Sequence, residues 1–254
     1  MSTLRGVTVR PTSSVALVLC SLGAWSVTAV FAVDMPAAPG TMGLGVFGFV
    51  ALWTVMMAAM MLPSVAPLVS LYLRRISSEP SAGARAARTS ALVVGYLTVW
   101  SGVGVVAFAL ARLGDALATR SPTLAPWVGA GALVVAGAYQ LTPLKDFCLS
   151  QCRSPISFLL HYANLKGRTR DFRVGLRHGL FCVGCCWGLM VVLVVVGVMS
   201  LAWMAAIAAA VLLEKTWRHG RALGRALGAA LIVFAVLVPS HPALLPGLHA
   251  TMSM

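Results

Sequence analysis

The residues best suited to chemistry are cysteines gathered at the start of one apolar run. The chain holds six cysteines, and the segment RHGLFCVGCCWGLM contains Cys182, Cys185 and Cys186. Residues three and four apart share one face of a helix, so these thiols form a stripe. His178 extends the stripe by one helical turn. Reduced thiols beside a histidine suit a soft or borderline metal, with Cu(I) the first choice and Zn(II) the second.

A second group of cysteines follows an earlier apolar run. Cys148 and Cys152 are four residues apart, so they also share a helix face. Five of the six cysteines are therefore expected at one membrane surface, the cytosolic one. Cysteines on that side stay reduced, which favours a metal site. The spacing matches no zinc ribbon, because only Cys182 and Cys185 form a Cys-x-x-Cys pair.

Two other interpretations of the cysteines stay open. A Cys-x-x-Cys pair near a helix start is also typical of a membrane thiol–disulfide oxidoreductase, which would use Cys182 and Cys185. Cysteine also packs as a small hydrophobe, and the chain would then be a passive assembly subunit of the membrane. The sequence identifies no catalytic residue beyond these thiols, so it favours a non-enzymatic role and leaves the enzyme open.

Methionines supply a second set of candidate ligands. The segment MMAAMMLPSVAP contains Met57, Met60 and Met61, and thioethers favour Cu(I). Pro63 removes a helical hydrogen bond in this segment and frees the carbonyl of Ala59. A free carbonyl inside a membrane must find a polar partner, so the helix is expected to lie beside one. The methionines are expected in the middle of the bilayer, on a path toward the thiols.

Charged side chains lie near the expected depth of the thiols. Glu214 ends the short apolar run LAWMAAIAAAVLL, and an ionisable residue within a membrane is a functional candidate by default. We therefore include Glu214 among the candidate metal ligands. Lys145 and Asp146, just before Cys148, are expected to pair with each other or with Glu214.

Composition identifies the class of protein that must position these side chains. Apolar residues make up 59% of the chain and charged residues 10%, and the mean hydropathy is +0.91. A soluble domain usually carries about 25% charged residues, so this chain is an integral membrane protein. Its net charge of +13 does not indicate a nucleic-acid partner, because the basic residues form short clusters between apolar runs.

The apolar runs predict an all-α, polytopic transmembrane bundle with about seven spans. A span needs about 20 apolar residues. With the N-terminus cytoplasmic and the C-terminus outside, all of the 19 lysines and arginines except Arg112 and Arg120 lie on the cytoplasmic side. This asymmetry fits the positive-inside rule. The runs are 15–33, 44–73, 91–111, 127–143, 179–198, 201–217 and 222–238.

The segments between the runs differ in composition. In the basic loop 144–177, Ser154 and Pro155 are typical of a helix start and precede apolar residues, which predicts a short helix in the membrane interface. The tail carries His241 and other possible metal ligands. The expected units are one integral membrane domain, 1–254, with a mobile cytoplasmic linker at 74–90, the cytoplasmic loop at 144–177 and an outside tail at 239–254.

Five motifs extend from about 54 to 215: MMAAMMLP, YQLTPLKDFCLSQCRSP, GLRHGLFCVGCCWGLM, VGVMSLAWM and LLEK. Together they resemble a bacterial domain family of unknown function, whose members are described as predicted metal-binding integral membrane proteins. The resemblance implies a polytopic bundle that binds metal. The residues that carry it are Met57, Met60, Met61, Pro63, Lys145, Cys148, Cys152, Arg153, His178, Cys182, Cys185, Cys186, Trp187 and Glu214.

The combined prediction is a multi-pass protein of the bacterial inner membrane that handles or delivers Cu(I). Thioethers bind Cu(I) without losing a proton, whereas thiolates hold it more tightly. Metal entering from outside would therefore pass from the methionines to the cysteines, which favours delivery over export. The expected partners are the lipid bilayer and a copper enzyme or metallochaperone.

Overall fold

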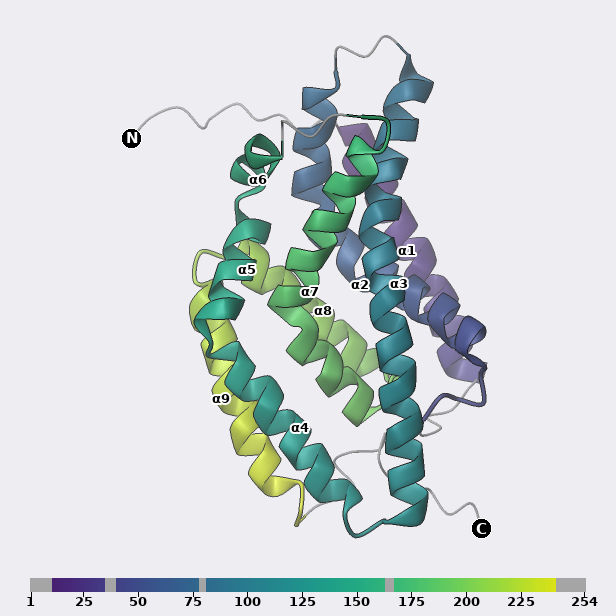
Figure 1. Ribbon diagram of the computed structural model, residues 1–254, viewed down its shortest axis with the longest axis vertical. Coiled ribbons are helices and arrows are strands. Elements are labelled where there is room, and N and C mark those ends of the chain that lie inside the picture. Colours follow the sequence, from purple (N-terminus) through teal and green to yellow (C-terminus); the bar gives the residue numbers. More distant parts are fainter. Residues whose placement is uncertain (1–10, 35–39, 78–80, 163–166, 241–254) are drawn as a thin grey trace.

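The computed structural model describes residues 11–34, 40–77, 81–162 and 167–240. Within these residues the chain is all-α, as predicted (Figure 1). The tail with His241 lies outside the described residues. The helices are α1 (Pro11–Asp34), α2 (Val46–Arg75), α3 (Ala82–Arg120), α4 (Ala125–Gln140), α5 (Pro143–Arg153), α6 (Pro155–His161), α7 (Arg170–Val196), α8 (Leu201–Thr216) and α9 (Gly220–Leu237).

Five of these helices, α1, α2, α3, α7 and α9, are long and apolar enough to cross a membrane. The pair α4 and α5 would add a sixth crossing, although the chain bends by 62° between them. Thr142 and Pro143 explain the break, because the Thr142 side chain caps the new helix and Pro143 occupies its first position. The expected run 201–217 forms α8, which has only 16 residues. The number of spans thus stays a prediction.

The segments predicted as linker and loop contain more helix than expected. α3 begins at Ala82, so residues 82–90 of the predicted linker 74–90 are helical. The predicted short helix is present as α6, and Ser154 stands at its N-cap without a side-chain hydrogen bond. Cys148 and Cys152, which were expected to share a helix face, lie on α5, whose bounds the sequence did not define.

Helix α7 lies against α3 at very short range, and glycines permit this approach. A Cβ atom on Gly95 would collide with the backbone of Phe172 in α7. A Cβ on Gly175 would likewise collide with the carbonyl of Leu92 in α3. Small residues of this kind let membrane helices pack backbone to backbone. The contact holds Tyr96 and the cysteine stripe of α7 in fixed register.

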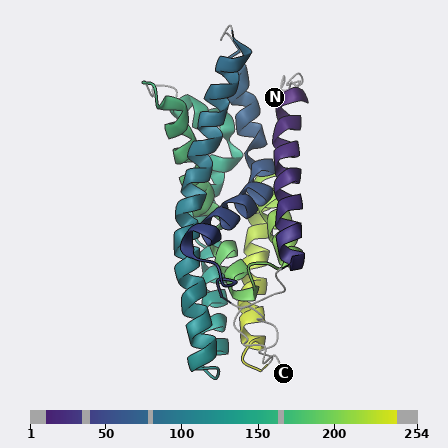
Figure 2. The same cartoon turned by 90° about the vertical axis from the view of Figure 1, so that its right-hand side faces the viewer.

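Helix α2 runs antiparallel to α3, on the side visible in Figure 2. The ring centroids of Phe49 and Phe108 are 5.4 Å apart, and the hydroxyls of Thr54 and Ser101 lie 2.9 Å apart. The helix continues through both of its prolines. The Ser21 hydroxyl in α1 donates to the carbonyl of Ala59 at 2.8 Å. The carbonyl that Pro63 frees therefore has the polar partner that the sequence required.

Candidate metal centre

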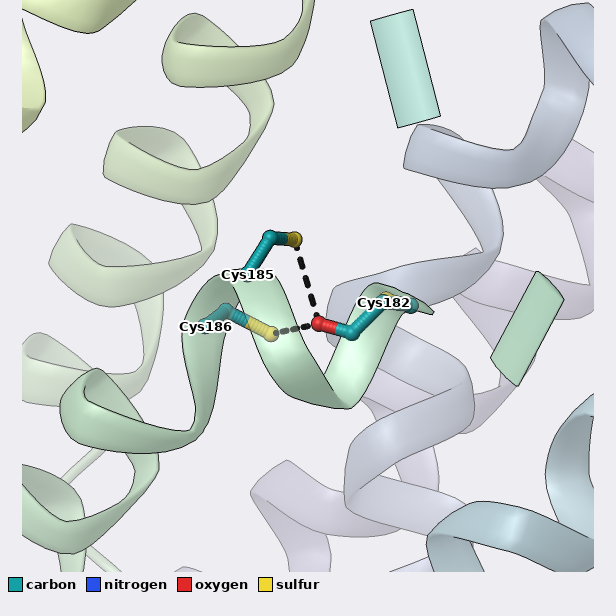
Figure 3. A group of neighbouring side chains, drawn as sticks. All are labelled: Cys182, Cys185 and Cys186. Carbon is teal, nitrogen blue, oxygen red and sulfur yellow. Dashed lines mark hydrogen bonds between the residues drawn. The ribbon is translucent and has the colours of Figure 1, made fainter. Parts of the chain in front are cut away.

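The three cysteines of α7 form a compact buried group. The sulfur atoms of Cys182, Cys185 and Cys186 all lie within 4.8 Å of one another. Figure 3 shows that the sulfurs of Cys185 and Cys186 bend back toward the carbonyl oxygen of Cys182, to which they donate at 3.1 and 2.9 Å. The helical spacing therefore produces the predicted stripe. Each thiol is at most 1% exposed, so an ion here would be shielded from bulk water.

Helix α5 brings its own cysteines to α7. The sulfur of Cys152 lies 3.9 Å from the sulfur of Cys185. Cys148 packs over Gly184, where an added Cβ atom would come within 2.7 Å of the Cys148 sulfur. The absence of a side chain at Gly184 thus lets Cys148 approach α7. The five cysteines expected at one depth come together from two helices.

The sulfur of Cys182 has polar partners that the sequence did not reveal. The Lys215 ammonium donates to it at 3.1 Å and to the Ser64 hydroxyl at 3.0 Å. The Tyr96 hydroxyl also forms a hydrogen bond with the Cys182 sulfur, at 3.0 Å. Lys215 and Cys182 lie equally far from the turn between α7 and α8, where Gly197 adopts a positive φ of 110°. The antiparallel pairing of the two helices therefore sets this contact.

His178 lies beside the thiols without joining their group. Its ring packs at 5.1 Å against Phe158 and at 5.9 Å against Tyr96. The residue is 2% exposed, and its Nδ1 atom is buried with no hydrogen-bond partner. An unsatisfied nitrogen one turn from Cys182 is available to a ligand.

Glu214 belongs to a different buried cluster. Its carboxylate accepts from the Lys145 ammonium at 2.7 Å, and both residues are 1% exposed. Lys145 also donates to the side chain of Gln140. The Arg153 guanidinium donates to the backbone carbonyl of Glu214 at 2.5 Å. Of the pairings that the sequence left open, that of Lys145 with Glu214 is present, and Asp146 pairs instead with Arg225 at 3.2 Å.

The methionines of α2 face the protein interior. Met57, Met60 and Met61 are each at most 2% exposed. In α2 they lie between Thr54 and Ser64. The Thr54 hydroxyl contacts that of Ser101 in α3, and the Ser64 hydroxyl accepts from the Lys215 ammonium, which also contacts the thiol group. The structure therefore places them in a buried stretch of α2 that ends beside the thiol group, while their role as ligands stays a prediction.

Sequence reasoning missed Lys215, Tyr96 and Ser64 for different reasons. Lys215 counts as a cytoplasmic basic residue in a topology argument, although it is 8% exposed in the fold. Tyr96 and Ser64 are single polar residues within apolar runs. The sequence held one indication of the role of Lys215, which is that it directly follows Glu214. Two ionisable residues at the end of a span are costly unless both are paired.

Comparison with known proteins bears on the metal. No curated protein and no solved structure matches the chain. A family model described as PpoB2, copper chaperone, matches residues 50–238. This range contains all of the clustered thiols and every described helix except α1 and residues 46–49 at the start of α2. The expectation of a metal-related family is confirmed in this form: the chain belongs to the PpoB2 copper chaperone family.

Proposed function

We propose that the protein binds Cu(I) at the thiol cluster of Cys152, Cys182, Cys185 and Cys186 and delivers it to another copper protein. The observation that carries the proposal is the gathering of these four sulfurs from two helices in a buried site. Thiolates are soft ligands and select Cu(I) over harder ions, with Zn(II) the second choice. Membership of a copper chaperone family supports the same metal. Cys148 and His178 flank the four sulfurs as further ligand candidates.

The proposed setting is a bacterial inner membrane that the chain crosses seven times. The N-terminus lies in the cytoplasm and the C-terminus outside. The asymmetry of basic residues supports this topology, with only Arg112 and Arg120 on the outer side. The antiparallel arrangement of α7 and α8 also supports this topology. The contact between Lys215 and Cys182 puts the end of α8 at the same depth as the thiols of α7. The thiols then lie toward the cytoplasmic side, where they stay reduced.

The methionines of α2 are proposed as weaker binding sites that the same ion occupies before it reaches the thiols. Met57, Met60 and Met61 lie in the buried stretch that ends at Ser64, and the Lys215 ammonium joins Ser64 to Cys182. Thioethers bind Cu(I) without deprotonation, and thiolates hold it more strongly. Cu(I) would therefore move from the methionines to the cysteines and leave for a copper enzyme or metallochaperone.

A thiol–disulfide oxidoreductase is the second candidate function. The observation in its favour is the 3.9 Å approach of the Cys152 and Cys185 sulfurs across two helices. This pair suits disulfide formation better than Cys182 and Cys185, which share a helix. All of the cysteines are free thiols in the structure. Trapping thiols in intact cells separates the two functions, since an oxidoreductase would show an oxidised fraction that turns over with an electron acceptor.

The decisive test of copper binding is anaerobic purification followed by elemental analysis. The wild-type chain is expected to retain copper, and the Cys182→Ser/Cys185→Ser/Cys186→Ser variant is expected to lose it. Cys20→Ser is the matched control, because Cys20 is an exposed thiol on α1 and stands apart from the cluster. Equal copper in the wild type and the triple variant would refute the proposal and leave a passive assembly subunit as the better description.

A further inference from the structure

At the end of α8, the buried ammonium of Lys215 contacts the sulfur of Cys182, a candidate copper ligand. Lys215 donates to the sulfur of Cys182 at 3.1 Å and to the hydroxyl of Ser64 at 3.0 Å. The residue is 8% exposed. In the described part of the chain, no ion pair includes Lys215. Its positive charge therefore lies in the protein interior beside thiols rather than beside a carboxylate.

A buried ammonium without a partner of opposite charge costs several kcal/mol. The nearest carboxylate in sequence, Glu214, is committed to Lys145 at 2.7 Å. Packing alone would favour an apolar residue at position 215. The ammonium is in contact with the Cys182 sulfur and the Ser64 hydroxyl, so the thiol group is the source of negative charge beside it once thiolates bind a metal there.

We propose that Lys215 is the counter-cation of the copper site and that its single charge limits the site to two thiolates per Cu(I). The inference rests on the proposed function. Two thiolates and one Cu(I) carry a net charge of minus one, which one ammonium neutralises. A third thiolate would leave an uncompensated negative charge in a region of low dielectric constant. Lys215 acts through Cys182 without touching the metal and is thus a positioning residue.

The geometry of the sulfurs accommodates a two-coordinate ion. Metal–sulfur bonds of roughly 2.3 Å, as for zinc, place two opposed sulfurs roughly 4.6 Å apart. The sulfurs of Cys182, Cys185 and Cys186 lie no more than 4.8 Å apart, so two of them can take up this separation by rotation of their side chains. Cys182 is the fixed member of the pair, because Lys215 and Tyr96 both hold its sulfur. Cys185 or Cys186 supplies the second thiolate, since each thiol donates to the backbone carbonyl of Cys182, and the Cys185 sulfur also lies 3.9 Å from that of Cys152.

The test uses the full chain in detergent under anaerobic conditions, with Cu(I) and Ag(I) as separate probes. X-ray absorption counts the sulfurs around Cu(I), and competition with a Cu(I) chelator measures affinity. We expect two sulfurs in the wild type. Lys215→Met should weaken Cu(I) binding by about 10- to 100-fold, as the loss of a group that supports a metal ligand does. Lys215→Arg retains the charge and should restore most of the affinity.

The matched control is Ser64→Ala, which removes the other hydrogen-bond partner of the ammonium but leaves its charge. It should weaken binding less than Lys215→Met does. Three sulfurs around Cu(I) in the wild type would overturn the proposal without any variant having to fold. So would equal affinities of the wild type and Lys215→Met, and in both cases the copper function stands.

Ag(I) separates the two proposals. If the wild type binds Ag(I) through two sulfurs in a manner that depends on Lys215 but binds no Cu(I), the copper function fails and the role of Lys215 stands. Binding of neither ion refutes both.

Discussion

Two buried lysines lie on neighbouring parts of the molecule and have opposite kinds of partner. Lys145 in α5 faces the carboxylate of Glu214, and Gln140 completes a cluster whose charges cancel. Lys215 in α8 faces the thiol of Cys182 and a serine hydroxyl. Glu214 and Lys215 are adjacent in sequence yet belong to different clusters. In the first cluster a carboxylate balances the ammonium, whereas in the second the ammonium contacts only a thiol and a hydroxyl among the described residues.

The largest expected effect comes from breaking the complete cluster. Lys145→Met leaves the Glu214 carboxylate buried without a partner, which costs about 3–5 kcal/mol in such pairs. We expect the free energy of unfolding in detergent to fall by that order. Thermal unfolding with fluorescence from the native tryptophans measures the change. The double variant Lys145→Met/Glu214→Gln should recover much of the loss, and equal instability of the single and double variants would contradict this account.

The next largest effect is a difference in Cu(I) affinity between variants of the two cysteines of α5. Cys152 contacts the Cys185 sulfur at 3.9 Å, whereas Cys148 packs over Gly184. We expect Cys152→Ser to weaken Cu(I) binding by about tenfold, in the range for groups that support a metal site. Chelator competition measures the affinity, and Cys148→Ser serves as the matched comparison with a smaller expected loss. Equal losses would mean that both thiols of α5 take part.

Alanine substitutions of two glycines compare how tightly the Lys145–Glu214 pair and the thiol group are packed. A Cβ atom on Gly224 would lie 3.0 Å from both the Glu214 carboxylate and the Lys145 ammonium. Gly224→Ala must therefore displace a buried ion pair, and we expect a loss of about 1–3 kcal/mol in unfolding free energy. Gly184→Ala meets the sulfur of Cys148 at 2.7 Å and its Cβ at 3.3 Å, but this neutral side chain can shift without separating an ion pair, so its cost should be smaller.

The control for both substitutions is Gly102→Ala in α3. An added Cβ there would meet nothing within 4 Å, and alanine favours a helix by about 1 kcal/mol over glycine. Thermal unfolding should place Gly102→Ala at or above the wild type and Gly224→Ala lowest. If Gly224→Ala unfolds like the control, the ion pair does not depend on close packing of α9.

The sequence predicted the parts of the fold that depend on local pattern. Apolar runs predicted the long helices, and helical spacing predicted the stripe of Cys182, Cys185 and Cys186. The Ala59 carbonyl was expected to need a polar partner, but Ser21 was not identified because it lies in another helix. Partners chosen by tertiary packing cannot be deduced from local pattern.

The same limit explains what was missed at the site. Lys215 follows a short apolar run, and its position alone is typical of a cytoplasmic anchor. Its contact with Cys182 depends on the glycine turn at Gly197 and on the pairing of α7 with α8. Helix α5 likewise joins the site only because Cys152 meets Cys185, a contact between two helices that its own sequence does not specify. Residues separated in sequence become one site through helix register, which no single motif encodes.

The smallest effect is expected from the methionines of α2. Met60→Leu/Met61→Leu removes two thioethers and preserves volume, so the unfolding free energy should change by less than about 1.5 kcal/mol per substitution. The thiols stay intact, and the final copper content should match the wild type. The rate at which Cu(I) reaches the thiols should fall, because the weaker thioether sites on its path to the cysteines are removed.

In proteoliposomes, the growth of copper–thiolate absorption after addition of Cu(I) from the outer side measures the loading rate. Met42→Leu is the control, because this half-buried methionine lies before α2. A double variant that loads as fast as this control would leave the thiol site in place and remove the methionine path. A double variant that loses copper altogether would instead make the thioethers part of the final site.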